Sequence, residues 1–185
     1  MLIAVVAVVA VLVLAIIPVN MLIGRKNRVN FAFSGIDTQL KKRFDLIPNL
    51  ISTVERYMQH EQQVLEKLTE LRAQAIKGSS SSAEDLVKMD NQLTSALRSV
   101  FAVSENYPQL RASENFMQLQ GALNETEEQI AASRRAYNAA VTDYNNGCEM
   151  FPLNMIARMM GYKTKPWFEV SEAERQNVNV KGLWS

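Results

Sequence analysis

Histidine and cysteine are nearly absent from this chain of 185 residues, which has one of each, His60 and Cys148. A single cysteine excludes a disulfide within the chain and fits a reducing compartment. Zinc sites need clusters of histidine and cysteine, and one chain of this composition cannot supply them. An excess of charge is also missing, because 20 Lys and Arg balance 19 Asp and Glu. We therefore expect no metal, no cofactor and no nucleic-acid partner.

Charged side chains are absent from the first 24 residues. The run from Leu2 to Ile23 is apolar except at Pro18 and Asn20. As a helix it would measure roughly 33 Å, enough to cross a hydrocarbon core of about 30 Å. The run is longer than the apolar part of a secretory signal peptide, and nothing basic precedes it. We therefore predict an uncleaved, single-pass transmembrane anchor over residues 1–24.

Basic residues follow this run at once, at Arg25, Lys26 and Arg28. Because Lys and Arg near a membrane end favour the cytoplasmic side, we predict that everything after the anchor is cytoplasmic. The anchor also carries small residues at three-residue spacing, Ala4, Ala7 and Ala10. These alanines either let a second helix approach closely or are simply compatible with lipid, and the sequence leaves both readings open.

Beyond the anchor, apolar residues recur at three- and four-residue steps, which is typical of amphipathic helices. One such pattern ends at Lys77-Gly78, a second runs from Ser82 to Pro108, and a third runs from Ser113 to Asn146-Gly147. A short helix is predicted over residues 154–160. We therefore predict an all-α fold, in which an N-terminal transmembrane helix precedes an antiparallel up-and-down bundle of three long helices plus a short fourth helix. The bundle occupies residues 25–162 and a C-terminal tail occupies residues 163–185.

Pro48 is the irregular point of the first long pattern. A proline inside a helix removes one hydrogen bond and disfavours the helical conformation of the residue before it. The helix could kink at Pro48, or it could stop and restart with Asp45 as its N-cap. The apolar pattern keeps its phase across Pro48, which favours the kink.

Several segments of the chain resemble the LemA family. The likeness is carried by residues 34–50, by Glu105-Asn106-Tyr107-Pro108-Gln109-Leu110-Arg111-Ala112 and by Phe116-Met117-Gln118-Leu119-Gln120. It continues through Arg134, Tyr137-Asn138, Tyr144-Asn145 and Phe151-Pro152. The resemblance implies a membrane-anchored antiparallel helical bundle in a bacterial cytoplasmic membrane. It departs at Phe44, where a polar residue is expected, and in the weakly matching tail.

Catalytic motifs are not found among the polar residues of these segments. His60-Glu61 begins like the zinc-protease motif H-E-x-x-H, but Val64 stands where the second histidine belongs. No serine or cysteine is placed to complete a triad. We therefore predict no enzyme activity and give these residues structural or interaction roles. The candidates are Asp37, Arg43, Asp45, Pro48, Asn49, Glu61, Arg134, Tyr137, Asn138, Tyr144 and Asn145.

Arg134 lies on the apolar face of the third helix, between Ile130 and Tyr137. It either sits at the border of that face and reaches water, or is buried and needs a carboxylate partner. Glu61, Glu127 and Asp37 are the candidate partners for the buried case.

The end of the third helix and the tail offer further interaction residues. Asn145 and Asn146 are interpreted as capping and turn residues, although this end could also form a surface for a partner. Four methionines lie near Phe151 and Tyr162 in the sequence: Met150, Met155, Met159 and Met160. We interpret them as part of the core, with an adaptable interface as the alternative. The tail, with Trp167 and Phe168, is expected to lie in a groove of the bundle or on a neighbouring subunit.

Long helices, near-zero net charge and an anchor with small residues favour a non-enzymatic scaffold that self-associates into a homo-oligomer at the membrane. The alternative is an adaptor that presents its bundle to another membrane protein. The resemblance names a candidate partner, since members of the LemA family are often encoded beside a membrane metalloprotease.

Overall fold

The computed structural model describes residues 1–58, 60–77 and 83–168, with side chains for all of these except residues 4–15, 77, 83 and 84. In this part of the chain the structure is all-α and contains no strand, as predicted. The helices are α1 (Leu2–Val54), α2 (Gln62–Lys77), α3 (Ala83–Ser104), α4 (Pro108–Arg111), α5 (Glu114–Glu149) and α6 (Leu153–Met159).

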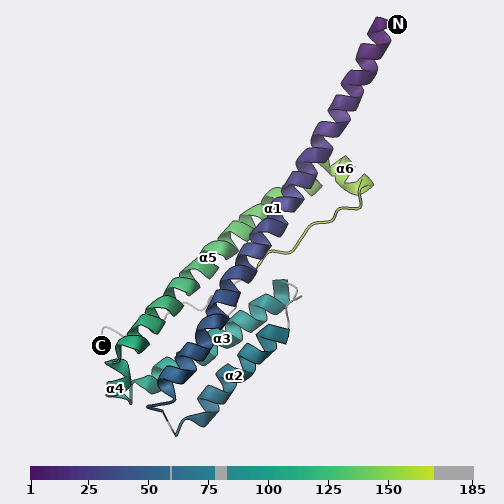
Figure 1. Cartoon of the computed structure of the whole chain (residues 1–185). Coiled ribbons are helices and arrows are strands. Elements are labelled where there is room, and N and C mark those ends of the chain that lie inside the picture. The colour runs from purple at the N-terminus through teal and green to yellow at the C-terminus, as the bar shows by residue number, and fades with distance from the viewer. Residues whose placement is uncertain (59, 78–82, 169–185) are drawn as a thin grey trace, which may run out of the picture.

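The long helices α1 and α5 run antiparallel and form the stem of the molecule (Figure 1). The hairpin of α2 and α3 packs beside the lower half of this stem. Helix α6 lies against the upper part of α1, near the C-terminal end of α5. The lower half is thus a four-helix up-and-down bundle, and the upper half is mainly the α1–α5 pair.

Helix α1 is continuous over 53 residues, so it measures about 80 Å. Pro48 lies inside it, and Asp45 is therefore an interior residue and not an N-cap. The alternative of a helix that stops and restarts at Pro48 is wrong. The missing hydrogen bond is tolerated because Ile47 and Leu50, on either side of Pro48, are fully buried in the core.

The prediction of one helix up to Lys77 is wrong, because the chain reverses direction between Val54 and Gln62. Met58 is fully buried in this turn, and its N–H donates to the carbonyl of Val54. The apolar period continues in phase from α1 into α2, and no glycine or proline marks the turn. The periodicity was therefore not able to signal the break, and the bundle has four long helices instead of three.

Two smaller differences concern helix ends. Pro108 begins α4 and does not end α3, which finishes at Ser104. Helix α5 does not stop at Gly147 but continues to Glu149. A Cβ atom at Gly147 would lie 3.2 Å from side-chain atoms of Leu22 and Arg25, so glycine permits the close approach of α1 and α5 here. The short helix α6 is found where predicted. It ends at Met159 and is followed by Gly161, whose φ is +69°.

Half of the predicted anchor, residues 4–15, has side chains that lie outside the described part of the chain. Among the described residues, no helix combines the length and the apolar character needed to cross a membrane.

The buried apolar residues form two clusters along the stem. The lower cluster fills the four-helix bundle and includes Ile47, Leu68, Leu93 and Leu123. The upper cluster joins α1, α5 and α6 and includes Leu22, Ile130, Val141 and Ala157.

Candidate functional site

Charged side chains from three helices meet in the interior of the bundle. Asp90 of α3 is almost fully buried, with 1% of its side chain exposed, and Arg43 of α1 is 5% exposed. Nη1 of Arg43 donates to Oδ1 of Asp90 at 2.7 Å. Nη2 of Arg134, on α5, donates to Oδ2 of the same carboxylate. One buried carboxylate therefore pairs with two guanidinium groups and connects α1, α3 and α5.

Further partners complete this network. Nη1 of Arg43 also donates to Oγ1 of Thr94 at 3.0 Å, and its Nη2 forms an ion pair with Oε2 of Glu127 at 2.5 Å. The guanidinium of Arg134 lies 5.0 Å from the centre of the Phe168 ring, a cation–π distance. Two arginines and two carboxylates balance, so the network carries no net charge.

The energetic role of such a network lies in specificity more than in stability. Removing charges from water costs several kcal/mol per ion, and this cost is offset only where the hydrogen bonds are well placed. Any shift of one helix along another would separate Asp90 from Arg43 or from Arg134. We therefore expect the network to fix the register of α1, α3 and α5.

A second polar arrangement holds residues 165–168 along α5. The side-chain amide of Asn145 donates to the carbonyl of Lys165 and accepts from its N–H, both at 2.9 Å. The side-chain amide of Asn138 donates to the carbonyl of Phe168 at 3.0 Å and accepts from the Phe168 N–H at 2.7 Å. Between them, Nε1 of Trp167 donates to Oγ1 of Thr142 at 3.0 Å.

The spacing of the two asparagines matches the segment that they bind. Seven residues of helix rise about 10.5 Å, and three residues of extended chain span about 10 Å. Each side-chain amide therefore bonds to both the backbone N–H and the backbone C=O of a single residue. The ring of Phe168 is buried and packs edge-on against Tyr137, with 6.2 Å between ring centres. We call residues 163–168 the docked segment.

The match to known sequences covers both arrangements. The model of the LemA family matches residues 32–181, from the middle of α1 through the docked segment.

The chain belongs to the LemA family.

Curated relatives of this LemA-family chain include a protein LemA and magnetosome proteins. Protein LemA of Metamycoplasma hominis is 27% identical over 89% of this chain and 74% of its own length. Magnetosome proteins MamQ 1 and MamQ 2 of Paramagnetospirillum magneticum are each 23% identical over 94% of this chain and 72% of their own length.

The partner of Arg134 differs from the three candidates named from the sequence. Arg134 is 14% exposed and pairs with Asp90, while Glu127 pairs with Arg43. The alternative that Arg134 reaches water at the border of the apolar face is wrong as well. Asp90 was missed although the sequence contains a signal for it. It stands four residues after Leu86 and three before Leu93, on the apolar face of α3.

The interpretation of Asn145 as a capping residue is also wrong, since α5 continues past it and its side chain binds Lys165. The docked segment lies on the bundle, as expected for a tail held in a groove; residues 169–185 lie outside the described residues.

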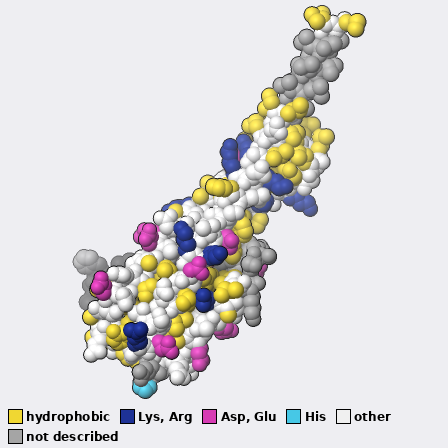
Figure 2. All heavy atoms as spheres, in the orientation of Figure 1, with side chains coloured by type: hydrophobic (Ala, Val, Ile, Leu, Met, Phe, Trp, Pro, Cys, Tyr) yellow, Lys and Arg dark blue, Asp and Glu magenta, His cyan; other side chains and the backbone are white. Residues whose placement is uncertain are grey.

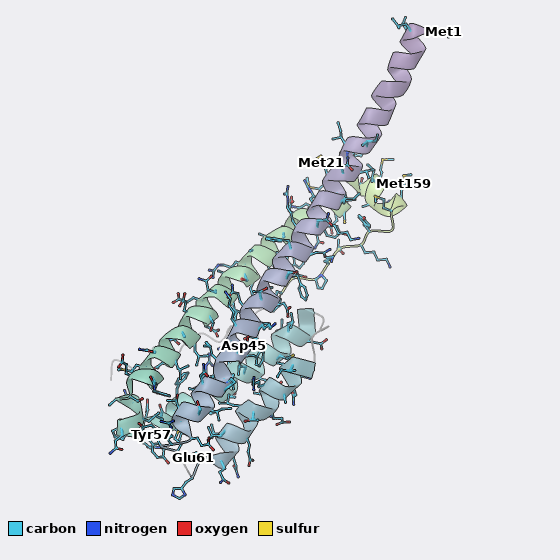
Figure 3. All side chains as sticks on the ribbon, viewed as in Figure 1. Met1, Met21, Asp45, Tyr57, Glu61 and Met159 are labelled. Carbon is cyan, nitrogen blue, oxygen red and sulfur yellow. The ribbon has the colours of Figure 1, made fainter. Side chains whose placement is uncertain are left out.

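The remaining candidates lie away from both arrangements. Asp37, Asp45 and Asn49 are exposed on α1, and no ion pair joins Asp37 to Lys41 within the described residues. Glu61 is half-buried near the turn between α1 and α2, at the lower end of the molecule (Figure 3). In the described part of the chain, no group of three or more His, Cys, Asp or Glu side chains could hold a metal ion.

Replacing the two arginines separately tests the network. We expect Arg43→Met to lower the free energy of unfolding by about 3 kcal/mol, because Arg43 contacts Asp90, Thr94 and Glu127. Arg134→Met is expected to lower the free energy of unfolding by about 1 kcal/mol. The loss is smaller because Arg134 is more exposed than Arg43, and Arg43 still pairs with Asp90. Urea unfolding followed by circular dichroism measures both. Unchanged or higher stability of Arg134→Met, with unchanged assembly, would remove Arg134 from the register-fixing role.

The raised pKa values of two tyrosines predict how the free energy of unfolding changes at alkaline pH. Burial raises the pKa of Tyr137, and burial together with a hydrogen bond to Cys148 raises the pKa of Tyr144. In the folded state both phenol groups therefore keep their protons at a pH where the same groups in the unfolded state have lost them. Their contribution to stability is complete below about pH 10 and falls as the pH rises further. We expect the unfolding free energy to decline less steeply above pH 10 in Tyr144→Phe than in the native chain. Equal slopes would contradict this account.

Proposed function

We propose that this LemA-family chain is a non-enzymatic, single-pass membrane protein whose bundle stands on the cytoplasmic face of a bacterial membrane and self-associates as a scaffold. The observation that carries the proposal is the continuity of α1, which joins the apolar N-terminal residues to the bundle as one helix. A continuous helix holds the bundle at a set distance from the membrane, whereas a flexible linker does not.

The chemistry at the top of the stem supports a membrane location. Arg25 and Arg28 of α1 follow the apolar run and pair with Asp143 of α5. Basic residues at this position favour the cytoplasmic side.

The arrangement of the buried charges supports a role other than catalysis. Both oxygens of Asp90 accept hydrogen bonds from arginines, and the carboxylate is almost completely shielded from solvent. A group held in this way positions helices and does not face an open cleft.

Self-association is supported by Phe31, which is 83% exposed on α1. It lies on α1 between Val29 and Ile36, which both belong to the upper cluster. Parallel anchors in one membrane would bring the stems of neighbouring copies side by side at this level. The alternative is an adaptor, in which the same surface binds another membrane protein, such as the metalloprotease that the family resemblance suggests.

The absolute mass of the full-length protein in detergent separates these functions. The scaffold predicts a discrete homo-oligomer from the purified chain, and Phe31→Ser is expected to shift the mass toward the monomer. Met117→Ser is the matched control, because Met117 is exposed on α5 at the lower end of the bundle. A monomeric native protein would refute the scaffold and favour the adaptor.

The side of the membrane needs a separate test. A reporter fused after Ser185 is expected to report a cytoplasmic location. A signal from the opposite face would overturn the orientation inferred from Arg25, Lys26 and Arg28.

A further inference from the structure

Apolar side chains around α6 are exposed to a degree that is unusual for their type. Phe151 is 79% exposed and Met159 is 87% exposed, and Met150 and Met155 are also exposed. The interpretation of these methionines as part of the core is therefore wrong. Exposed apolar patches of this kind mark surfaces that contact something else.

Helix α6 packs against the upper cluster through one side, which leaves its other side exposed. Ala157 is buried, and Ile156 packs against the upper cluster that contains Leu22. Phe151, Met155 and Met159 follow one another at four-residue steps and point away from this packing. We call these three residues the α6 face.

The α6 face lies beside the apolar end of α1. Figure 3 shows Met159 and Met21 at a similar height along the stem, on neighbouring helices. Ile16, Ile17 and Met21 of α1 are exposed too. Figure 2 shows hydrophobic side chains gathered at this neck of the molecule, with basic side chains next to them.

Charge is distributed unevenly along the molecule around this neck. Residues 16–30 and 143–168 contain six basic and two acidic side chains, which leaves the rest of the chain net acidic. The basic ones are Arg25, Lys26, Arg28, Arg158, Lys163 and Lys165. One of the two acids, Asp143, already pairs with Arg25 and Arg28, and Arg28 still exposes 75% of its side chain. Anionic headgroups complement such a surface.

We propose that the α6 face inserts into the headgroup and upper acyl region of the same bilayer that α1 crosses, with the basic side chains at the level of anionic lipid phosphates. This inference rests on the proposed membrane anchor. A single helix in a membrane can rotate about its axis and tilt, because its apolar length fixes neither. A second contact, offset from that axis by α6, sets the rotation and the tilt of the whole stem.

A bilayer suits this surface better than a folded partner does. The α6 face continues the exposed apolar surface of α1, and the basic side chains border both. Amphipathic elements at membrane interfaces combine the same features, apolar residues on one side and Lys or Arg at the edge. Methionine side chains are flexible and adapt to a fluid surface.

The test uses the full chain in phospholipid vesicles that contain anionic lipid and a lipid with a nitroxide on the upper acyl chain. A fluorescent label is attached to single cysteines in a Cys148→Ala background, at Met159→Cys, Ile16→Cys and Met117→Cys. Ile16 reports the anchor, and Met117 is an exposed methionine at the far end of the bundle. We expect the nitroxide to quench the labels at positions 159 and 16 at least threefold more than the label at position 117.

Other outcomes separate the two proposals. Quenching at position 16 but not at 159 would refute the membrane contact of α6 and leave the anchor standing. No quenching at either position would refute the anchor and the inference with it. A label at position 159 that is shielded from water but not quenched by the lipid would also overturn the inference, in favour of a protein contact.

Discussion

Asp90→Ala is expected to lower the free energy of unfolding by about 3–5 kcal/mol. The change removes the carboxylate that accepts from Arg43 and Arg134 and leaves two guanidinium groups facing each other without it. Arg43 is nearly fully buried, so water cannot replace the lost partner. Equilibrium unfolding of the full chain in urea, followed by circular dichroism, measures the loss.

Asp37→Ala is the matched control, because it removes an exposed carboxylate from α1. We expect Asp37→Ala to lower the free energy of unfolding by less than about 0.5 kcal/mol. A loss of less than about 1 kcal/mol in Asp90→Ala would contradict the buried network.

A triple variant distinguishes unpaired charge from lost packing. Arg43→Met, Asp90→Leu and Arg134→Met together replace the buried charges with apolar side chains, and Glu127 keeps access to water with 40% of its side chain exposed. Replacing a whole buried ion network in this way is often neutral or stabilising. We expect the triple variant to recover most of the stability that Asp90→Ala loses.

Replacing Asn138 and Asn145 together by alanine is expected to release the docked segment. The two side chains make four hydrogen bonds to the peptide groups of Lys165 and Phe168. At about 1 kcal/mol for each bond, the double variant should lose about 4 kcal/mol of docking free energy. Hydrogen exchange at the amides of Lys165 and Phe168 measures this directly, and we expect it to accelerate at least 100-fold.

Asn146→Ala serves as the control for the docked segment, because Asn146 neighbours Asn145 but is exposed on α5. It should leave exchange at Lys165 and Phe168 unchanged. Asn145→Asp should accelerate exchange near Lys165 as well, since a carboxylate cannot donate to the Lys165 carbonyl. If exchange in the double variant matched the native chain, the asparagines would not hold the segment.

The helical character of the chain could be predicted from periodicity alone, because every long helix buries one apolar face. The reversal between α1 and α2 could not, since it keeps the apolar period and contains no glycine or proline. It is specified by tertiary burial of Met58. Such packing depends on residues that are distant in the sequence, so a local sequence pattern does not predict it.

The candidate site was predicted only in part, for a related reason. Polar character within the family-like segments, or a place on a helix face, indicates four of the site residues: Arg43, Arg134, Asn138 and Asn145. Their partners lie between 20 and 47 residues away along the chain. Asp90 could have been recognised as a polar residue on an apolar face, but its pairing with two arginines needed the packing of three helices.

The most direct test of the account is alkaline extraction of membranes from cells that express the full chain. If α1 crosses the bilayer as proposed, the protein stays with the membrane pellet. The variant Val9→Asp with Leu12→Asp places two carboxylates in the apolar run, at a cost of about 2.5–3.5 kcal/mol each at a helix centre, and should be released. Release of the native chain into the supernatant would contradict the anchor and the function built on it.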